Sequence, residues 1–266
     1  MKKYRPNFWA GHEQLFRPEY SILEKIYIGF FGMPIIGLRI RNRNILSLIP
    51  KQTYHHILDA GTGQGVLSFA LSQRYPKAVV LGIDQSRQSI QSCLHIARKI
   101  QTQNIHFQQE LIEELSQNNV FDLVTCVDIL EHIHDDRQAL KKIYQAMAIG
   151  GILILHVPAK YRRYPVWKKD LNFHVESHVR VGYEPKEIYQ KVKETGFMVV
   201  DIGFTYGFWE TLANNISYMI TGAQMRHKWL YALTFPGLHL ISLLGIRARP
   251  KKMGAGIYLI LKKEFL

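Results

Sequence analysis

The amino-acid sequence predicts an α/β fold with a mostly parallel sheet. From residue 55 onward, short apolar segments with the length of buried strands alternate with amphipathic segments of about ten to fifteen residues. Parallel strands need a crossover connection, usually a helix, so this alternation indicates repeated strand–helix–strand units. In addition, residues 57–65 pass from an apolar strand directly into a glycine-rich turn, which is typical of the first unit of such sheets.

The first fifty residues show no strand alternation, and we expect a helical N-terminal extension over 1–50 that is broken near Gly32 and Pro34. The strands that we expect after it begin at residue 57 and then cover 79–83, 105–108, 121–127, 152–157, 197–204 and 256–261.

Helices are expected between these strands. Ser86 is a suitable N-cap for one helix, and Asp135 and Asp136 cap another, whose buried face includes Met147 and which the glycine pair 150–151 ends. Pro185 begins a further helix. Ligands of such sheets bind at the carboxyl ends of the strands, so the site is expected there.

Composition limits the function classes. Lys and Arg total 34 against 21 acidic residues, a net charge of +13, which favours a polyanionic partner such as nucleic acid or an anionic membrane surface. A surface of solvated lysines would explain the same excess. The two cysteines lie in apolar segments and offer no disulfide framework, so a reducing compartment and a cytoplasmic location are expected. No secretory signal is expected at the N-terminus.

The glycine turn indicates a nucleoside-containing cofactor. Glycines at 61, 63 and 65 let a ligand lie against bare backbone, and Asp59 precedes them by two residues. Asp84, at the end of the next strand, can accept hydrogen bonds from both hydroxyls of a ribose. The glycine spacing differs from the dinucleotide pattern and no Walker lysine follows, so a phosphate cradle has little support.

The D-x-G-x-G-x-G segment at 59–65 resembles motif I of the class I S-adenosylmethionine-dependent methyltransferases. The resemblance extends over roughly 55–205 and the last strand, and includes the Glu131-His132 pair after the fourth strand. It implies a Rossmann-like three-layer sandwich with a seven-stranded sheet whose last strand runs antiparallel between the fifth and sixth. It also implies a domain over 51–266 with cap insertions at about 158–184 and 207–252.

The same resemblance implies S-adenosylmethionine as cofactor. The glycine turn would hold the methionine end, Asp84 the ribose, Glu110 the adenine amino group, and the Leu111 backbone the adenine ring. Thr62 stands where the family more often has cysteine or serine. The expected cofactor-binding residues are Asp59, Ala60, Gly61, Thr62, Gly63, Gly65, Asp84, Gln85, Glu110, Leu111 and Val127.

The acceptor side is less constrained, because methyl transfer is an in-line displacement that needs a general base only for acceptors such as hydroxyls. His156, His174 and His178 are the candidate bases, each weighed against a structural role. Asp128 could touch the sulfonium or the acceptor. No metal site is expected, because His174 and His178 lack a third ligand at a telling spacing.

Two apolar stretches, 26–38 and 229–246, each carry basic residues at their trailing edge: Arg39, Arg41 and Arg43 after the first, and Arg247, Arg249, Lys251 and Lys252 after the second. Each stretch either caps the active site or contacts a membrane. For 229–246 a helix lying in the interface, with Trp229, Tyr231 and Phe235 at the headgroups, fits better than a spanning helix, because Pro236 and His239 interrupt it.

A nucleic-acid partner is not expected, because residues 127–130 lack the proline–aromatic turn with which amino-methylating enzymes stack a flipped base. We therefore expect a methyltransferase that acts on an oxygen of a small or lipid-linked acceptor. We expect the protein to be cytoplasmic, and whether it also associates with an anionic membrane stays open. A protein or RNA methyltransferase that uses the basic surface, and a non-catalytic scaffold with this fold, are the alternatives.

Overall fold

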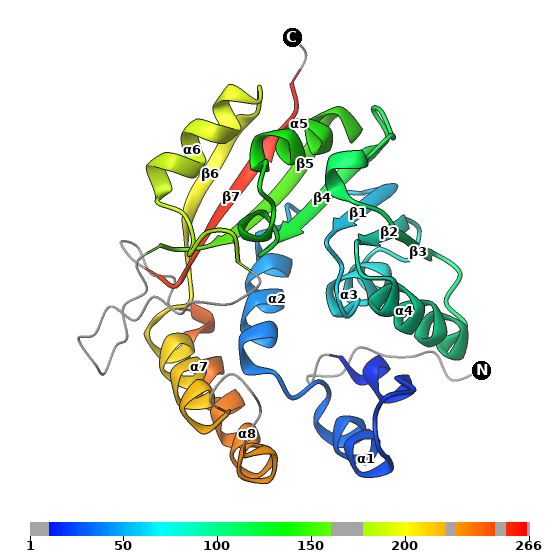
Figure 1. The fold of residues 1–266 in the computed structure, drawn as a ribbon, viewed down its shortest axis with the longest axis vertical. Coiled ribbons are helices and arrows are strands. Elements are labelled where there is room, and N and C mark those ends of the chain that lie inside the picture. The colour runs from blue at the N-terminus through cyan, green and yellow to red at the C-terminus, as the bar shows by residue number, and fades with distance from the viewer. Residues whose placement is uncertain (1–10, 161–177, 222–226, 248–253, 265–266) are drawn as a thin grey trace.

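A computed structural model describes residues 11–160, 178–221, 227–247 and 254–264 (Figure 1). Its strands are β1 His56–Ala60, β2 Val79–Asp84, β3 Ile105–Gln109, β4 Phe121–Val127, β5 Met147–Pro158, β6 Met198–Thr205 and β7 Gly256–Lys262. Its helices are η1 His12–Phe16, α1 Ile22–Phe31, α2 Ile36–Leu48, α3 Val66–Arg74, α4 Arg87–Ile100, η2 Ile112–Glu114, η3 Leu130–His132, α5 Asp136–Ala146, α6 Pro185–Glu194, α7 Phe208–Thr221, α8 Lys228–Leu243 and η4 Leu244–Arg247.

The seven strands form one sheet in the order β3-β2-β1-β4-β5-β7-β6. β7 pairs antiparallel with both β5 and β6, and the other neighbours are parallel. The predicted α/β fold and its antiparallel last strand are confirmed.

One boundary was predicted wrongly. Met147 was expected on the buried face of the helix that precedes β5, but α5 ends at Ala146 and Met147 begins the strand, paired with Phe121. Gly150, at φ +81°, and Gly151 allow β5 to bend: a Cβ on Gly151 would lie 2.9 Å from the carbonyl oxygen of Phe121. The two glycines therefore shape the strand rather than stop the helix.

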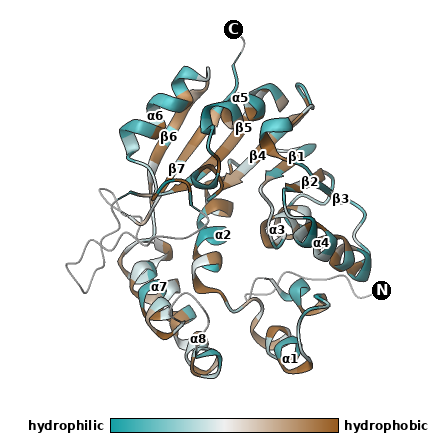
Figure 2. Ribbon diagram, in the orientation of Figure 1, coloured by the Kyte–Doolittle hydropathy of each residue, from teal (hydrophilic) through white to brown (hydrophobic). Residues whose placement is uncertain are grey.

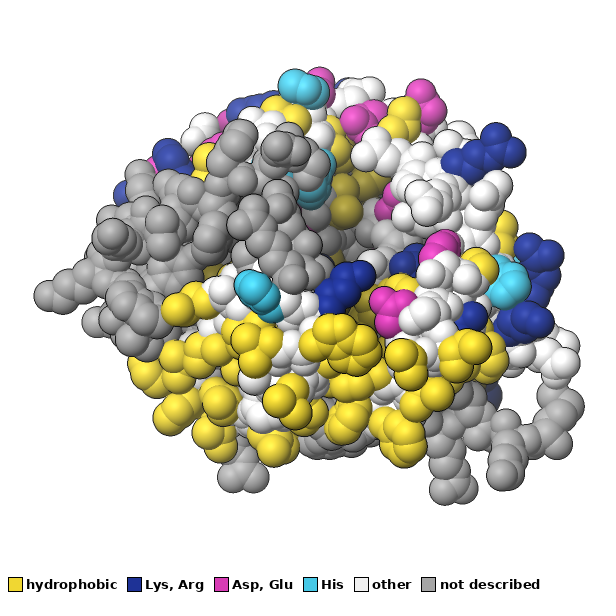
Figure 3. Space-filling model, turned by 60° about the horizontal axis from the view of Figure 1, so that its bottom comes forward, with side chains coloured by type: hydrophobic (Ala, Val, Ile, Leu, Met, Phe, Trp, Pro, Cys, Tyr) yellow, Lys and Arg dark blue, Asp and Glu magenta, His cyan; other side chains and the backbone are white. Residues whose placement is uncertain are grey.

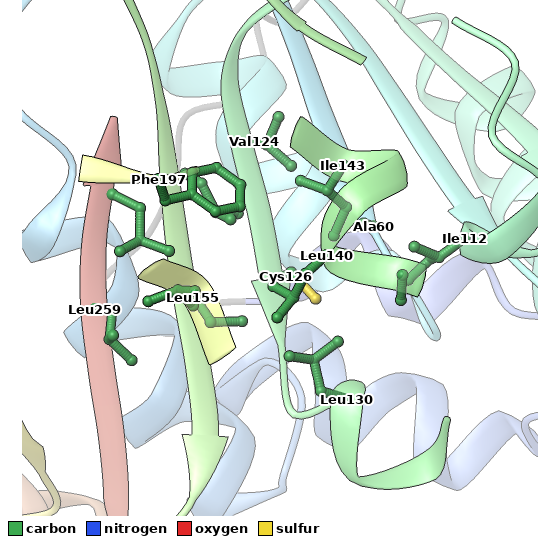
Figure 4. Close-up of a cluster of buried hydrophobic side chains, with 14 of the residues drawn as sticks. Ala60, Ile112, Val124, Cys126, Leu130, Leu140, Ile143, Leu155, Phe197 and Leu259 are labelled. Atoms are coloured by element: carbon green, nitrogen blue, oxygen red, sulfur yellow. The ribbon is translucent and has the colours of Figure 1, made fainter. Parts of the chain in front are cut away.

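Two apolar clusters cover the two faces of the sheet. Leu140 and Ile143 of α5 and Ile188 of α6 pack against β4, β5 and β7 on one face, part of which is shown in Figure 4. α2, α3 and α4 pack on the opposite face, with Ile45 and Phe69 in its centre. The helix–sheet–helix arrangement is the predicted three-layer sandwich.

A third apolar cluster joins the N-terminal helices to the C-terminal insertion. Ile36 and Ile40 of α2 pack with Ala213 of α7 and with Tyr231 and Phe235 of α8, and the side chains of Tyr27 and Phe31 of α1 lie against them. Figure 1 shows α1, α2, α7 and α8 together beyond the carboxyl ends of the parallel strands. The helices of the extension and the insertion therefore form one helical layer at the edge where the site is expected.

The three arginines that follow residues 26–38 in the sequence, Arg39, Arg41 and Arg43 of α2, all bind polar atoms of the protein. Arg39 is buried: its Nε donates to the Met33 carbonyl at 2.7 Å, and its guanidinium lies 4.9 Å from the Phe235 ring centre. Burial lowers the pKa of Arg39 to about 10. Arg43 donates to the Glu210 carboxylate at 2.7 Å. The side chains of Arg39 and Arg43 therefore bind polar atoms within the helical layer rather than solvent.

Candidate active site

The glycine turn between β1 and α3 has room for a side chain at one of its three glycines and none at the other two. Gly61, Gly63 and Gly65 all have positive φ (+82°, +50° and +76°), which favours glycine. A Cβ on Gly61 would lie 2.2 Å from Cδ1 of Ile129, and one on Gly65 would lie 2.8 Å from Sγ of Cys93. No atom of the described residues lies within 4 Å of a Cβ on Gly63. The turn therefore offers bare backbone to a ligand at Gly63.

Asp59 supports this turn from beneath. Its buried carboxylate accepts hydrogen bonds from Ser68 Oγ at 2.6 Å and Thr125 Oγ1 at 2.7 Å, and Thr62 Oγ1 lies 2.6 Å from Ser68 Oγ. Burial raises the pKa of Asp59, against the lowering effect of these hydroxyls. The sequence did not indicate Ser68 or Thr125, because each is a single hydroxyl in an apolar element. These hydrogen bonds to α3 and β4 give Asp59 a supporting role in the turn, and any contact of its own with a cofactor stays a prediction.

Asp84 holds the turn from the side. At the end of β2, its Oδ2 accepts a hydrogen bond from the Gly63 amide and its Oδ1 one from the Ser86 amide, both at 2.8 Å. A carboxylate has about four acceptor positions, so lone pairs remain for a ribose. The carboxylate is thus fixed in orientation before a ligand arrives.

The remaining predicted cofactor residues gather at the same edge. The Glu110 amide donates to the Asp84 carbonyl at 3.1 Å, and burial raises the pKa of the Glu110 carboxyl. Gln85 and Leu111 are exposed beside them, and Val127, at the end of β4, is half-buried. Ala60 is buried at the end of β1. All these residues follow four neighbouring strands, in the order β3-β2-β1-β4. Their individual contacts with a cofactor stay predictions.

Asp128, directly after β4, belongs to a charge network that the sequence only partly indicated. Asp128 has φ +53°, a left-handed conformation that short polar side chains tolerate. One of its carboxylate oxygens is bound by the Arg41 guanidinium, and the other lies 2.5 Å from Nδ1 of His156. Burial alone would raise the pKa of Asp128, but Arg41 and His156 hold it well below its usual range. Arg41 comes from α2, so no local spacing could link it to Asp128.

The three candidate bases lie in different surroundings. His156 is 1% exposed, and its Nε2 lies 2.7 Å from Thr205 Oγ1, so both ring nitrogens have protein partners. His178 is half-buried, with its ring centre 4.5 Å from that of His132. His174 lies outside the described residues. The base role of each stays a prediction.

The pKa of Asp128 predicts how acid affects stability. The carboxyl titrates near about 3.9 in an unfolded chain, above its folded pKa, so its ion pairs stabilise the fold above that pH and are lost as the pH falls through the folded pKa. We expect Asp128→Asn to be less stable than the wild type at neutral pH, with a difference that shrinks below about pH 4. Urea denaturation at several pH values measures this, and a constant difference would contradict it.

The N-terminal segment also reaches the turn. Gln14 of η1 is buried, and its Nε2 donates to the Gln64 carbonyl at 3.0 Å. Glu19 accepts a hydrogen bond from Ser92 of α4 at 2.5 Å. These contacts place η1 over the glycine turn, which the sequence alone did not indicate.

Comparison with known proteins agrees with this geometry. The family model described as a methyltransferase domain matches residues 52–217. The trans-aconitate 2-methyltransferase of Deinococcus radiodurans is 34% identical over 119 residues, which are 45% of this chain and 44% of that protein. A ubiquinone biosynthesis O-methyltransferase of Coxiella burnetii is 36% identical over 99 residues, 37% and 41% of the two chains. The chain thus spans less than half of the length of these relatives.

Solved structures share the fold at low identity. The phosphoethanolamine N-methyltransferase 2 of Haemonchus contortus, in complex with S-adenosyl-L-methionine, superposes with a TM-score of 0.65 at 18% identity, over 96% of this chain and 60% of that one. The cyclase SpnF superposes with a TM-score of 0.55 at 17% identity, over 85% and 80%.

The family model covers well over half of the chain and includes the glycine turn, Asp84 and Asp128. The seven-stranded sheet, with its last strand antiparallel between the fifth and sixth, is the one that the resemblance implied. The chain therefore belongs to the methyltransferase domain family, as a class I S-adenosylmethionine-dependent methyltransferase.

Proposed function

We propose that the protein transfers a methyl group from S-adenosylmethionine to an oxygen of a small or lipid-linked acceptor. The observation that carries this proposal is the open backbone at Gly63 beside the oriented Asp84 carboxylate, one strand away from the Asp128 network. The glycine turn would hold the methionine part, Asp84 the ribose and Glu110 the adenine amino group. S-adenosylmethionine supplies a methyl carbon activated by a sulfonium.

Transfer requires the acceptor oxygen, the methyl carbon and the sulfur to be collinear. The oxygen–carbon bond forms as the carbon–sulfur bond breaks, the sulfur keeps the bonding pair, and the acceptor hydroxyl loses its proton to a base or to water. The low pKa of Asp128 makes it a poor base but a good fixed negative charge near the sulfonium. Oxygen is favoured as the methylated atom by the matched relatives that are named as O-methyltransferases.

The acceptor class can be tested with methyl-labelled S-adenosylmethionine and three acceptor pools: small metabolites, extracted lipids, and protein with RNA. We expect label in the metabolite or lipid pool. Label in protein or RNA alone would support the basic-surface alternative. Tight cofactor binding without label in any pool would favour the scaffold alternative.

An exposed apolar face supports a lipid-linked acceptor. Figure 3 shows apolar side chains gathered over the face that α1, α7 and α8 form, and Figure 2 shows apolar residues along these helices. Trp229 and Leu233 of α8 are 79% and 80% exposed, and Phe30 of α1 is 71% exposed. Further exposed members are Ile22, Leu23, Ile26, Met219, Leu230, Leu240 and Leu244. An apolar area of this extent marks an interaction surface.

We propose an anionic phospholipid bilayer as the partner of this face. The exposed residues 229, 233 and 240 of α8 and 244 at the start of η4 form one stripe, whereas Tyr231, Phe235 and Leu238 of α8 are buried. The hydroxyl of Tyr27 donates to the Ala232 carbonyl at 2.6 Å, which ties α8 to α1. Basic residues lie in the sequence at the start of α8, at 226 and 228, and after it, at 247, 249, 251 and 252. A one-sided apolar helix flanked by cations fits an interfacial position.

Among the described residues, one helical stretch, Lys228–Ile246, is long and apolar enough to cross a bilayer by length and composition alone. Because its buried side packs into the helical layer, an interfacial position agrees better with the structure than a spanning one. Trp229 alone of the three aromatics predicted for the headgroups is exposed, since Tyr231 and Phe235 point into the protein.

Charging the stripe is expected to weaken membrane binding. Each buried leucine contributes about 1.5–3 kcal/mol, so the double variant Leu233→Glu/Leu240→Glu is expected to bind anionic phospholipid vesicles at least about tenfold more weakly than the wild type. Vesicle co-sedimentation measures this. Val200→Glu, which also charges an exposed apolar position but on β6, is the matched control. Equal binding of all three proteins would contradict the proposed surface.

A further inference from the structure

We infer that Glu131, His132 and His178 form a binding site for a divalent transition-metal ion beside the acceptor position. Each residue offers one ligand atom, and these atoms all lie within 4.8 Å of one another. Glu131 is 1% exposed, and the two histidines are half-buried. His178 is 46 residues from His132 in the sequence, so no local spacing indicated this cluster, which forms because the fold brings His178 to the Glu131-His132 pair.

The ligand types point to a particular class of ion. Two imidazole nitrogens and one carboxylate oxygen suit zinc, cobalt, manganese or iron better than calcium, which prefers oxygen ligands. Metal–ligand bonds of about 2.0–2.2 Å would hold the ligand atoms roughly 3–3.5 Å apart, so small side-chain rotations would close the observed spacing.

The backbone around the cluster is firmly held. The amide of Val179, directly after His178, donates to the Glu131 carbonyl at 2.9 Å. Arg180 then binds the buried Asp136 carboxylate at 2.5 Å, and the Tyr183 hydroxyl donates to the same carboxylate at 2.8 Å. This network ties the segment that carries His178 to the loop that carries Glu131. Ligands on such a supported scaffold keep their relative positions before the ion binds.

The cluster also lies next to the proposed cofactor site. Asp128 precedes Glu131 by one short connection, and between them the Ile129 side chain packs on Gly61 of the glycine turn. The same connection therefore contacts the cofactor turn and carries two of the three ligands. His156 is buried and has protein partners at both ring nitrogens, whereas His132 and His178 are half-buried.

Three protein ligands leave coordination positions open on such an ion. Those positions would recognise an acceptor with two adjacent oxygen atoms, such as a catechol or a 2-hydroxy carboxylate. A bound cation also lowers the pKa of hydroxyl groups that it contacts, which meets the need for proton loss without a side-chain base. This specificity for chelating acceptors rests on the proposed function; the metal site itself does not.

The site can be tested on the full chain after removal of metal with a chelator. Calorimetric titration with Zn²⁺ and visible absorption with Co²⁺ are expected to show one site of micromolar or tighter affinity. Glu131→Gln and His178→Ala are each expected to weaken binding at least tenfold. His134→Ala removes an exposed histidine two residues from His132 and is expected to bind the metal like the wild type. Circular dichroism shows whether each variant is folded.

The outcomes separate the metal site from the proposed function. Absence of a stoichiometric site, or an equal loss of affinity in His178→Ala and His134→Ala, would overturn the metal site even if methyl transfer is found. If His178→Ala does not fold, His132→Ala decides in its place. A confirmed metal site in a protein that methylates nothing would instead remove the chelating-acceptor specificity and count against the proposed function.

Discussion

Replacing Asp84 with alanine is expected to lower the affinity for S-adenosylmethionine at least about 100-fold. Hydrogen bonds to a charged acceptor contribute about 1.5–3 kcal/mol each, and the variant would lose two of them to the ribose hydroxyls. It would also lose the hydrogen bonds from the Gly63 and Ser86 amides, both 2.8 Å long, which hold the turn in place. The ligand would therefore lose direct contacts and a preformed turn.

Calorimetric titration of the wild type and the variant with S-adenosylmethionine and S-adenosylhomocysteine measures this effect. Gln88→Ala is the matched control, because Gln88 is exposed on α4, four residues after Asp84, is not among the expected cofactor-binding residues and is expected to change affinity only slightly. Asp84→Ala with nearly wild-type affinity would show that another residue holds the ribose. No binding to the wild-type protein would count against the cofactor site as a whole.

The substitution Gly61→Ala is expected to lower the free energy of unfolding by about 2–5 kcal/mol. A left-handed conformation costs a residue with a Cβ roughly 1–2 kcal/mol, and overpacking a core costs about 1–3 kcal/mol more. Both apply at Gly61, where φ is +82° and a Cβ would lie 2.2 Å from the Ile129 side chain. Urea denaturation without cofactor measures the change.

Gly63→Ala separates the two contributions. Gly63 also has positive φ, but it faces open space among the described residues. We expect it to lose only about 1–2 kcal/mol of stability and, in contrast to Gly61→Ala, to weaken cofactor binding by placing a methyl group on the open side of the turn. Equal destabilisation by both substitutions would show that contact with Ile129 is not what makes Gly61 necessary.

Local patterns predicted the elements of this protein well. The glycine turn and Asp84 lie within one strand–helix–strand unit, and residues 105–108 and 121–127 carry enough apolar and β-branched residues to indicate strands from composition. The antiparallel seventh strand was implied by the family resemblance, because no property of residues 256–261 taken alone determines its direction.

The parts of the site that depend on distant contacts were not predictable in this way. Arg41 appeared to be one of three cations behind an apolar stretch, yet it binds Asp128 because α2 crosses the edge of the sheet. His156 was a candidate base, and its burial between Asp128 and Thr205 depends on the order of β4, β5 and β6. Hydropathy showed that residues 229–246 are apolar but not which side of the helix meets the protein.

The shared apolar cluster of α2, α7 and α8 has a consequence for dissecting the protein into fragments. The family model covers residues 52–217, and a fragment with those limits would lack Ile36, Ile40, Tyr231 and Phe235. It would uncover Tyr206 and Ala213, which are buried in the complete layer, and would leave Asp128 without Arg41. Strand β7, which joins β5 to β6, also lies outside those limits. The smallest fragment able to fold alone and keep its charge network thus begins upstream of α2 and extends through β7, well outside the limits that sequence similarity marks.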